Sequence, residues 1–253
     1  MKKILLAASM LVAGLMGCSR YDDPYVSATC MPSVIKMNSK TAYKYYYTGV
    51  TLQRAEYVSL ENDSIISTID YTYENKLLVK AATTPTGKNK PTSYSEYEYN
   101  SGEKLAKATN FVLQADTITY LQTGYKTFNY DIKGNLFRET TFDGTSSDLK
   151  EQRTYEYDVQ NNKTKMYLKV GTAGEYYAER YLYDDNKGTK SAFPAPLRGD
   201  KNNLLFMERY DAMGKVIKGA RYTYAYAPNE TRYPVKFYDP LTKVTYEITY
   251  NCR

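Results

Sequence analysis

The sequence predicts an all-β protein: an antiparallel up-and-down meander of about 14–16 strands, built from hairpin repeats, that closes or flattens into a barrel-like sheet. Three observations support this fold class. The chain of 253 residues contains 30 Tyr, and most of them recur at a nearly constant interval. Runs of alternating apolar and polar residues follow them, and turn-forming residues separate these runs. We expect one barrel domain over residues 41–253, after a removed segment 1–17 and a linker 18–40.

The repeat begins with an aromatic residue, any residue, a Tyr and then Asp, Glu or Asn. A turn and an alternating run complete it. Successive copies of the second Tyr are 26, 26, 31, 27, 26 and 27 residues apart. A unit of this length predicts two strands, joined by one tight turn and one looser loop. The second Tyr of each copy falls at Tyr47, Tyr73, Tyr99, Tyr130, Tyr157, Tyr183 and Tyr210.

Each part of the repeat has a local physical reason. Two Tyr separated by one residue place both rings on the same face of a strand. The carboxylate of Asp131 can accept a backbone hydrogen bond and start a turn, and Gly134 supplies a positive φ without steric cost. Asn, which tolerates that conformation best among the other residues, can replace the Gly. The same pairing occurs at Asp158 and Asn161, Asp185 and Gly188, and Asp211 and Gly214.

One copy of the repeat resembles a known family. Tyr130, Asp131, Gly134, Asn135 and Leu136 are similar to the YD repeat of Rhs-type proteins, whose consensus is Tyr-x-Tyr-Asp-x-x-Gly-Arg/Asn-Leu. Phe128 takes the place of the first Tyr. The resemblance covers about residues 40 to 250, but too few repeats are present to build the toxin-enclosing shell of that family. The chain looks more like uncharacterised bacterial lipoproteins with YD-like repeats and a porin-like barrel, a group without a catalytic motif.

The predicted strands have one apolar-aromatic face and one polar face. Ile69, Tyr71 and Tyr73 alternate with Asp70 and Thr72, for example. A transmembrane barrel would turn the aromatic face to lipid, whereas a soluble barrel would turn it inward. We favour the soluble form because the Tyr are spread along the strands rather than confined to girdles. About sixteen strands enclose more space than one layer of side chains fills, so we expect either a flattened barrel or a Tyr-lined cavity.

The N-terminal residues read as an export signal. A short cationic start precedes an apolar run to Leu15, too short to span a bilayer, and Leu15-Met16-Gly17-Cys18 resembles the lipobox of bacterial lipoproteins. The resemblance implies cleavage before Cys18, acylation of that Cys, and attachment to the outer membrane on its periplasmic face or at the cell surface. Asp22 and Asp23 resemble a surface-export signal, and a solvated linker is the alternative.

Two further cysteines remain for the exported chain. An even pair in an exported protein predicts a disulfide between Cys30 and Cys252, which would tie the first strand to the last. Two independent buried thiols are the alternative.

The composition excludes several classes of chemistry. The chain has no His, so it has no Ser-His-Asp or Cys-His nucleophile and no His-based zinc site. The acidic residues of the repeat lie in turns where a structural role suffices. No glycine-rich phosphate loop is present, and Lys and Arg form no basic cluster. We therefore expect no enzyme, no metal, no cofactor and no nucleic-acid partner, and we expect a monomer.

The expected activity is binding of a glycan or another envelope or extracellular ligand, because exposed Tyr rings stack on sugars. Two alternatives remain: the rings are simply core, or the protein is a structural or accessory lipoprotein that docks on an outer-membrane partner. The densest Tyr clusters are Tyr43, Tyr45 and Tyr47, and Tyr222, Tyr224 and Tyr226.

Two short segments resemble the O-glycosylation sequon of some Gram-negative envelopes. They are Asp63-Ser64-Ile65 and Asp116-Thr117-Ile118, which make Ser64 and Thr117 candidate acceptors. Ordinary polar strand positions are the alternative interpretation.

Overall fold

The structure is a computed structural model that describes residues 30–115, 118–189, 193, 195–197, 200–226 and 232–252. Cys18, Asp22, Asp23 and Thr117 lie outside the described residues. No helix among the described residues is long and apolar enough to cross a membrane. The regular elements are β1 (Cys30–Met37), β2 (Lys40–Thr48), β3 (Thr51–Val58), β4 (Ile65–Glu74), β5 (Leu77–Pro85), β6 (Ser93–Tyr99), β7 (Leu105–Leu113), β8 (Tyr120–Tyr130), β9 (Leu136–Asp143), β10 (Leu149–Tyr157), β11 (Lys163–Val170), β12 (Tyr176–Lys187), the 3₁₀ helix η2 (Ala195–Leu197), β13 (Asn202–Tyr210), β14 (Val216–Arg221), β15 (Thr223–Tyr226), β16 (Pro234–Asp239) and β17 (Val244–Cys252).

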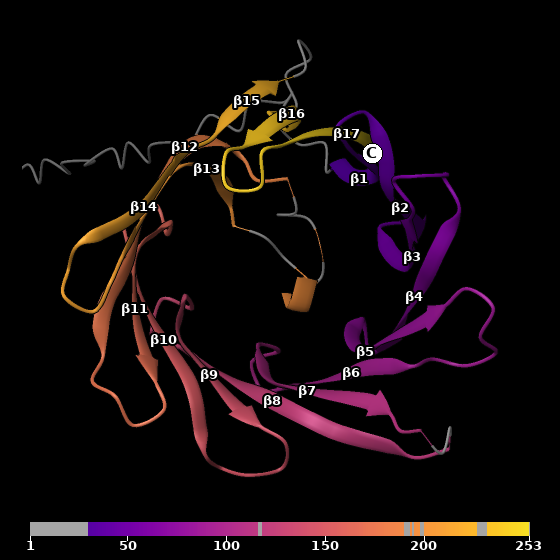
Figure 1. The fold of residues 1–253 in the computed structure, drawn as a ribbon, viewed down its shortest axis with the longest axis horizontal. Helices are drawn as coiled ribbons and strands as arrows, with labels where there is room; N and C mark the ends of the chain where they lie inside the picture. Colours follow the sequence, from indigo (N-terminus) through magenta and orange to yellow (C-terminus); the bar gives the residue numbers. More distant parts are fainter. Residues whose placement is uncertain are drawn as a thin grey trace, which may run out of the picture.

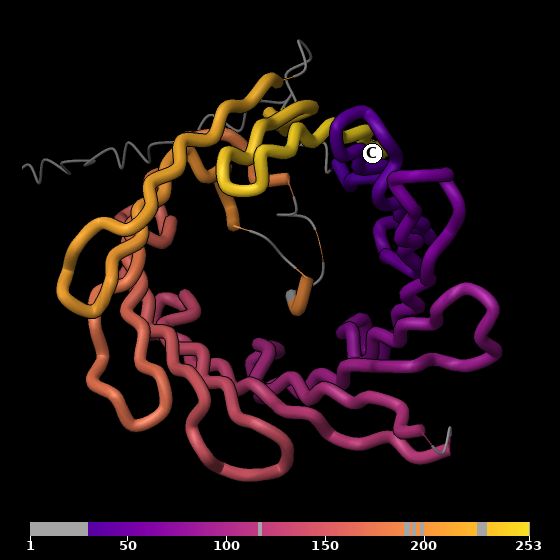
Figure 2. The backbone as a smooth tube through the Cα atoms, viewed as in Figure 1, coloured from indigo at the N-terminus to yellow at the C-terminus, as the bar shows by residue number. Residues whose placement is uncertain are grey.

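The strands form a ring in sequence order, which confirms the predicted antiparallel meander (Figure 1). Consecutive strands pair antiparallel, and β1 pairs with β17, so the start of the chain meets its end (Figure 2). Because β1 begins at Cys30, the barrel starts before the expected boundary at residue 41.

The count of 17 strands exceeds the prediction because one strand is interrupted. Only Tyr222 separates β14 from β15, and these two strands do not pair with each other. β14 pairs with β13, whereas β15 pairs with β16. β14 and β15 are therefore two halves of one long strand, so the wall is built from sixteen such strands. An even number is what an antiparallel ring needs in order to close.

The tight turns that follow β2, β4, β6, β8 and β10 lie at one end of the barrel. We call it the cysteine end, because β1 starts there at Cys30 and β17 finishes there at Cys252. Since neighbouring strands run in opposite directions, β4, β6, β8 and β10 also finish at this end, with their repeat Tyr. The looser loops lie at the opposite end, which we call the far end.

A recurring hydrogen bond explains why the repeat uses Tyr rather than Phe. The hydroxyl of the second Tyr donates to the backbone carbonyl of a Leu near the start of a strand in the preceding repeat. Each bond ties one hairpin to the next and gives the half-buried hydroxyl a partner. The bonds are Tyr73 to Leu52 (2.8 Å), Tyr99 to Leu78 (2.8 Å), Tyr130 to Leu105 (3.0 Å) and Tyr157 to Leu136 (2.7 Å).

The turns follow the chemistry that the sequence predicts. Asp131 Oδ1 accepts a hydrogen bond from the backbone N–H of Asn135 at 2.8 Å, and Gly134 has a φ of 88°. Asp158 accepts equivalently from Asn162 at 2.9 Å, and Asn161, in place of Gly, has a φ of 65°.

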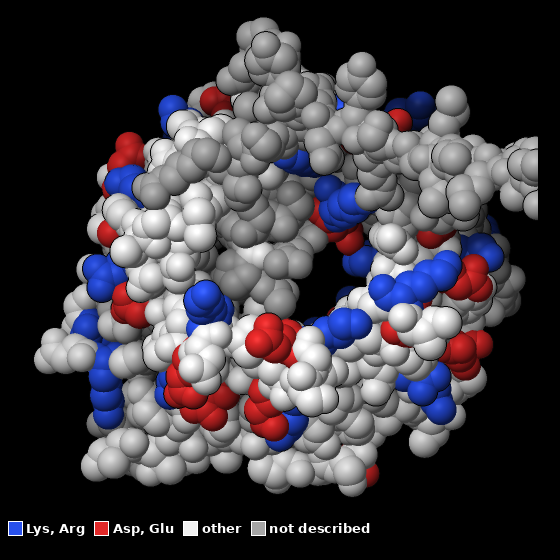
Figure 3. Space-filling model, turned by 180° about the vertical axis from the view of Figure 1, so that it is seen from behind, with Lys and Arg blue, Asp and Glu red and all other residues white. Residues whose placement is uncertain are grey.

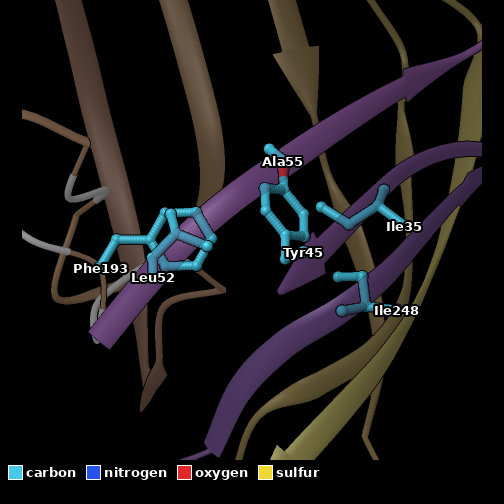
Figure 4. Close-up of a cluster of buried hydrophobic side chains, with 6 residues drawn as sticks. All are labelled: Ile35, Tyr45, Leu52, Ala55, Phe193 and Ile248. Atoms are coloured by element: carbon cyan, nitrogen blue, oxygen red, sulfur yellow. The ribbon is translucent and has the colours of Figure 1, made fainter. Parts of the chain in front are cut away.

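The barrel interior contains a plug that the sequence analysis did not anticipate. Between β12 and β13 the chain turns inward, and η2 lies inside the ring (Figure 1). We call the described residues of this excursion, Phe193, Ala195–Leu197 and Asp200, the plug. Phe193 is buried against the inner face of the wall, in a cluster with Ile35, Tyr45, Leu52, Ala55 and Ile248 (Figure 4). The interior is therefore partly filled by a loop.

The plug shifts the phase of the repeat. The interval from Tyr183 to Tyr210 holds the plug and one strand, so the prediction of two strands per repeat is wrong here. Tyr210 consequently ends β13 at the far end, where its ring stacks on Tyr177 with centroids 4.7 Å apart. The predicted turn from Asp185 to Gly188 is also wrong, because β12 continues to Lys187.

The outer face of the wall carries cross-strand ion pairs between register partners. Glu96 and Glu98, which flank Tyr97 on the inner face, point outward. They contact Lys80 at 3.4 Å and Lys107 at 3.2 Å, and Arg54 contacts Asp70 at 2.7 Å. Seen from one end, acidic and basic side chains are also intermixed around the central opening (Figure 3).

Candidate functional site

A cavity of about 460 Å³ lies inside the barrel, between the plug segment and the wall built by β1, β2, β13, β15, β16 and β17. Its volume falls in the range of small-molecule sites. Tyr43 from β2 and Tyr224 from β15 both line it. Because β17 and β1 close the ring, one Tyr from each of the two predicted clusters reaches the same cavity.

One wall of the cavity is a row of aromatic rings. Tyr224 stacks on Phe237 with centroids 5.6 Å apart, and Phe237 stacks on Tyr246 at 4.5 Å with an interplanar angle of 9°. The row exists because Tyr224, Phe237 and Tyr246 are direct register partners on β15, β16 and β17. Cross-strand partners on one face bring their side chains together. Because the rings face one another, the row presents apolar ring edges to the cavity.

The other groups at the cavity are acidic or amide side chains held by fixed partners. Asp200 forms an ion pair with Lys163 Nζ at 2.9 Å. Asp239 accepts hydrogen bonds from the backbone N–H of Leu241 at 2.8 Å and from the hydroxyl of Thr242 at 2.9 Å. Asn202 donates to the carbonyl of Asn186 at 2.9 Å. No Lys or Arg is among the described residues that line the cavity. The site therefore offers hydrogen-bond acceptors beside an apolar aromatic row.

A buried network supports the lining at Asn203. The backbone N–H of Asn203 donates to Asp184 Oδ1 at 3.0 Å, and its side-chain amide donates to the carbonyl of Lys187 at 3.1 Å. Tyr226 donates its hydroxyl to the other carboxylate oxygen of Asp184. These bonds fix the start of β13 against the end of β12.

The remaining predicted Tyr have structural surroundings. Tyr45 is buried in the core, where its ring meets Phe193 edge to face at 5.3 Å. Tyr47 donates its hydroxyl to the carbonyl of Pro32 at 2.7 Å. Tyr222 and Tyr226 flank Tyr224 along the chain but do not line the cavity. Of these four rings only Tyr45 belongs to the buried core, and none of the four lines the cavity.

The structure adds residues that sequence reasoning missed. Phe237, Tyr246, Asp239 and Asn203 line the cavity although they belong to neither predicted Tyr cluster. Their only sequence signal is alternation, with Phe237 and Tyr246 on the apolar face of their strands. Alternation alone does not show which strands become neighbours.

Two other candidate positions have defined places. Cys30 and Cys252 are register partners and form a disulfide across 222 residues of sequence. Ser64 lies in the exposed loop between β3 and β4 and donates its hydroxyl to Asn62 at 2.7 Å. Among the described residues, no group of three or more Cys, Asp or Glu is arranged to hold a metal ion.

Burial shifts the titration of the inward-facing phenols. It raises the pKa of Tyr73, Tyr99 and Tyr155 to about 12. At the cavity, burial is the main cause that raises the pKa of Tyr43 and Tyr224. These hydroxyls are thus neutral hydrogen-bond donors throughout the physiological range.

The shifts predict alkaline unfolding. A Tyr in an unfolded chain titrates near about 10, so above that pH the unfolded state loses protons that the folded state retains. Stability from these Tyr is fully present below pH ~10 and is lost as pH rises toward ~12. In urea titrations at stepped pH we expect the unfolding midpoint to fall across this window, with phenolate absorbance rising together with unfolding. A midpoint that stays constant across the window would contradict the inward placement of the rings.

The fold places the chain among large antiparallel β-barrels, with a loop inside the ring. Among solved structures it is similar to a porin-like protein from Bacteroides uniformis, with 13% identity, coverage of 88% of this chain and 98% of that chain, and a TM-score of 0.53. A porin-like protein from Bacteroides vulgatus matches at 12% identity over 88% of this chain and 99% of that chain, with a TM-score of 0.49. At such identities the first similarity shows the fold alone. No protein-family model matches the chain, and no curated protein sequence does.

Proposed function

We propose that the chain is a non-enzymatic lipoprotein of the cell envelope, held at the outer membrane by a lipid anchor on Cys18, which binds a glycan in the cavity. The observation that carries the proposal is the aromatic row of Tyr224, Phe237 and Tyr246 beside fixed Asp and Asn side chains. Sugar rings present an apolar C–H face and equatorial hydroxyl groups. The apolar aromatic row and the nearby acceptors match those two features.

The outer wall supports an aqueous surrounding for the barrel. Lys80, Glu96, Lys107 and Glu98 form exposed ion pairs along it, and charges of this kind are costly against lipid. A lipid anchor would then hold the barrel at the membrane without inserting its strands. The similarity of fold to a porin-like protein agrees with an envelope location.

A glycan array probed with the full chain tests the proposal, and titration of a retained glycan then locates the site. Phe237→Leu keeps an apolar side chain but removes the ring at the centre of the row. Loss of its stacking, worth about 1 kcal/mol, should weaken binding roughly five- to tenfold.

The matched control is Phe142→Leu, which removes a ring stacked on Tyr125 at 4.6 Å on another part of the wall. Its affinity should equal that of the wild type. A uniformly blank array, or equal losses in the two variants, would count against a glycan in this cavity.

A further inference from the structure

The interrupted strand leaves one free edge in the wall. β14 pairs with β13 from Phe206 to Tyr210, but no described strand pairs with its other side. The neighbouring strand in the ring is β16, which ends at Asp239. It pairs with β15 as far as Thr223 and does not reach β14. The edge from Val216 to Arg221 therefore extends beyond the strand that would have covered it.

The peptide groups on this edge can be assigned by alternation. The N–H of Tyr222 donates to the carbonyl of Leu205 at 2.9 Å, so it points toward β13. Because the direction alternates along the regular stretch from Lys218 to Tyr222, the peptide groups of Gly219 and Arg221 point to the open side, whereas Ile217 lies outside this stretch, at the register shift opposite Arg209 and Tyr210. They form a row of donors and acceptors of the kind that another strand recognises.

The side chains leave room for such a strand. Val216 and Ile217 are 49% and 57% exposed. At Gly219, in the middle of the edge, a Cβ would meet no atom within 4 Å. Gly inside a strand often marks a place where another backbone approaches closely.

The charges indicate what that strand would carry. On the closed part of the wall, cations face acidic residues of the neighbouring strand, as Lys80 faces Glu96 and Lys107 faces Glu98. Lys215, Lys218 and Arg221 form no ion pair with any described acidic residue. Lys218 and Arg221 lie on opposite faces of β14, because the register between them is regular, so an added strand would need acidic side chains on both of its faces.

We propose that β14 is a strand-addition site for an extended acidic segment of a partner protein, which runs antiparallel to β14 and continues the line of β16. This site goes beyond the cavity and does not depend on the glycan proposal. A second copy of the chain fits poorly, because edge-to-edge pairing would set Lys218 and Arg221 against the same cations.

The test uses the full chain and a fluorescent peptide of repeated Val-Val-Glu-Glu, with anisotropy as the readout. This peptide, called the Val-Glu peptide below, has Glu on both faces when it is extended. Gly219→Pro removes an N–H on the open edge and leaves the N–H groups that face β13. We expect affinity for the peptide to fall more than about tenfold, since Pro blocks the ladder of the added strand. The matched control, Gly219→Ser, keeps the N–H and fits the open space, so it should bind like the wild type.

Charge-reversal variants distinguish strand addition from adhesion to an apolar edge. Lys218→Glu combined with Arg221→Glu should weaken the Val-Glu peptide by about tenfold or more. Lys133→Glu, in a turn at the cysteine end, makes the same kind of change away from the edge and should have little effect. The same peptide with Lys in place of every Glu should not bind the wild type.

Several outcomes would overturn the proposal. They are no binding of the Val-Glu peptide to the wild type, equal binding to Gly219→Pro, or a wild-type dimer that Gly219→Pro converts to a monomer. Hydrogen exchange supplies a measurement independent of the variants, because the peptide should slow exchange at Gly219 and Arg221. Unchanged exchange at these N–H groups during peptide binding would also overturn it.

Discussion

Replacing both Cys30 and Cys252 by Ser should lower the free energy of unfolding by up to about 5 kcal/mol, the largest effect expected of any change in this chain. The bond closes a loop with a sequence separation of 222 residues, and cross-links across long loops restrict the unfolded chain most. It also holds β1 against β17, the pair that completes the ring. Urea unfolding followed by circular dichroism measures the change.

The double Ser variant has a built-in control. Reductant should lower the wild type's free energy of unfolding to the value of the variant, and it should not change the variant's own free energy of unfolding. Equal unfolding of the wild type with and without reductant would contradict a stabilising bond. Labelling of free thiols at both positions in the oxidised protein would do the same.

Truncation of Phe193 should destabilise the barrel by about 3–5 kcal/mol, as expected for a buried aromatic residue changed to Ala. Phe193 is 3% exposed and packs edge to face on Tyr45 at a centroid distance of 5.3 Å. Its removal leaves a cavity between the plug and the inner wall. Because the plug continues toward Asp200 at the candidate site, Phe193→Ala should also weaken glycan binding.

Chemical denaturation of Phe193→Ala beside Ile132→Ala measures the effect. Ile132 lies fully exposed in the turn after β8, so its truncation should change the free energy of unfolding by less than about 0.5 kcal/mol. If the two variants unfold alike, Phe193 does not hold the plug in the interior.

Much of the fold could be predicted because the repeat encodes it locally. Tyr-x-Tyr sets the face of a strand, and an acidic residue with a following Gly or Asn sets the turn. Asp131 and Gly134 illustrate this, since both the hydrogen bond and the positive φ are present. The sequence could also pair Cys30 with Cys252, because they are the two cysteines left after Cys18.

The plug and the cavity could not be predicted, because they depend on contacts between distant segments. Nothing local distinguishes an inward excursion at Phe193 from a surface loop, so the regular interval from Tyr183 to Tyr210 concealed the loss of a strand. The site likewise depends on register. Phe237 becomes part of an aromatic row only when β15 and β17 flank it.

The disulfide at the cysteine end has a mechanical consequence. Residues 30 to 252 form a covalent cycle, so the sheet cannot unroll from a loose first or last strand. A pull on the residues that precede Cys30 is shared at once by β1 and β17. Such a force acts along both strands, so it shears the hydrogen bonds that join β1 to β2 and β17 to β16. Many of these bonds share the load at the same time and are not broken one by one. A tethered barrel of this design resists tension along its strands.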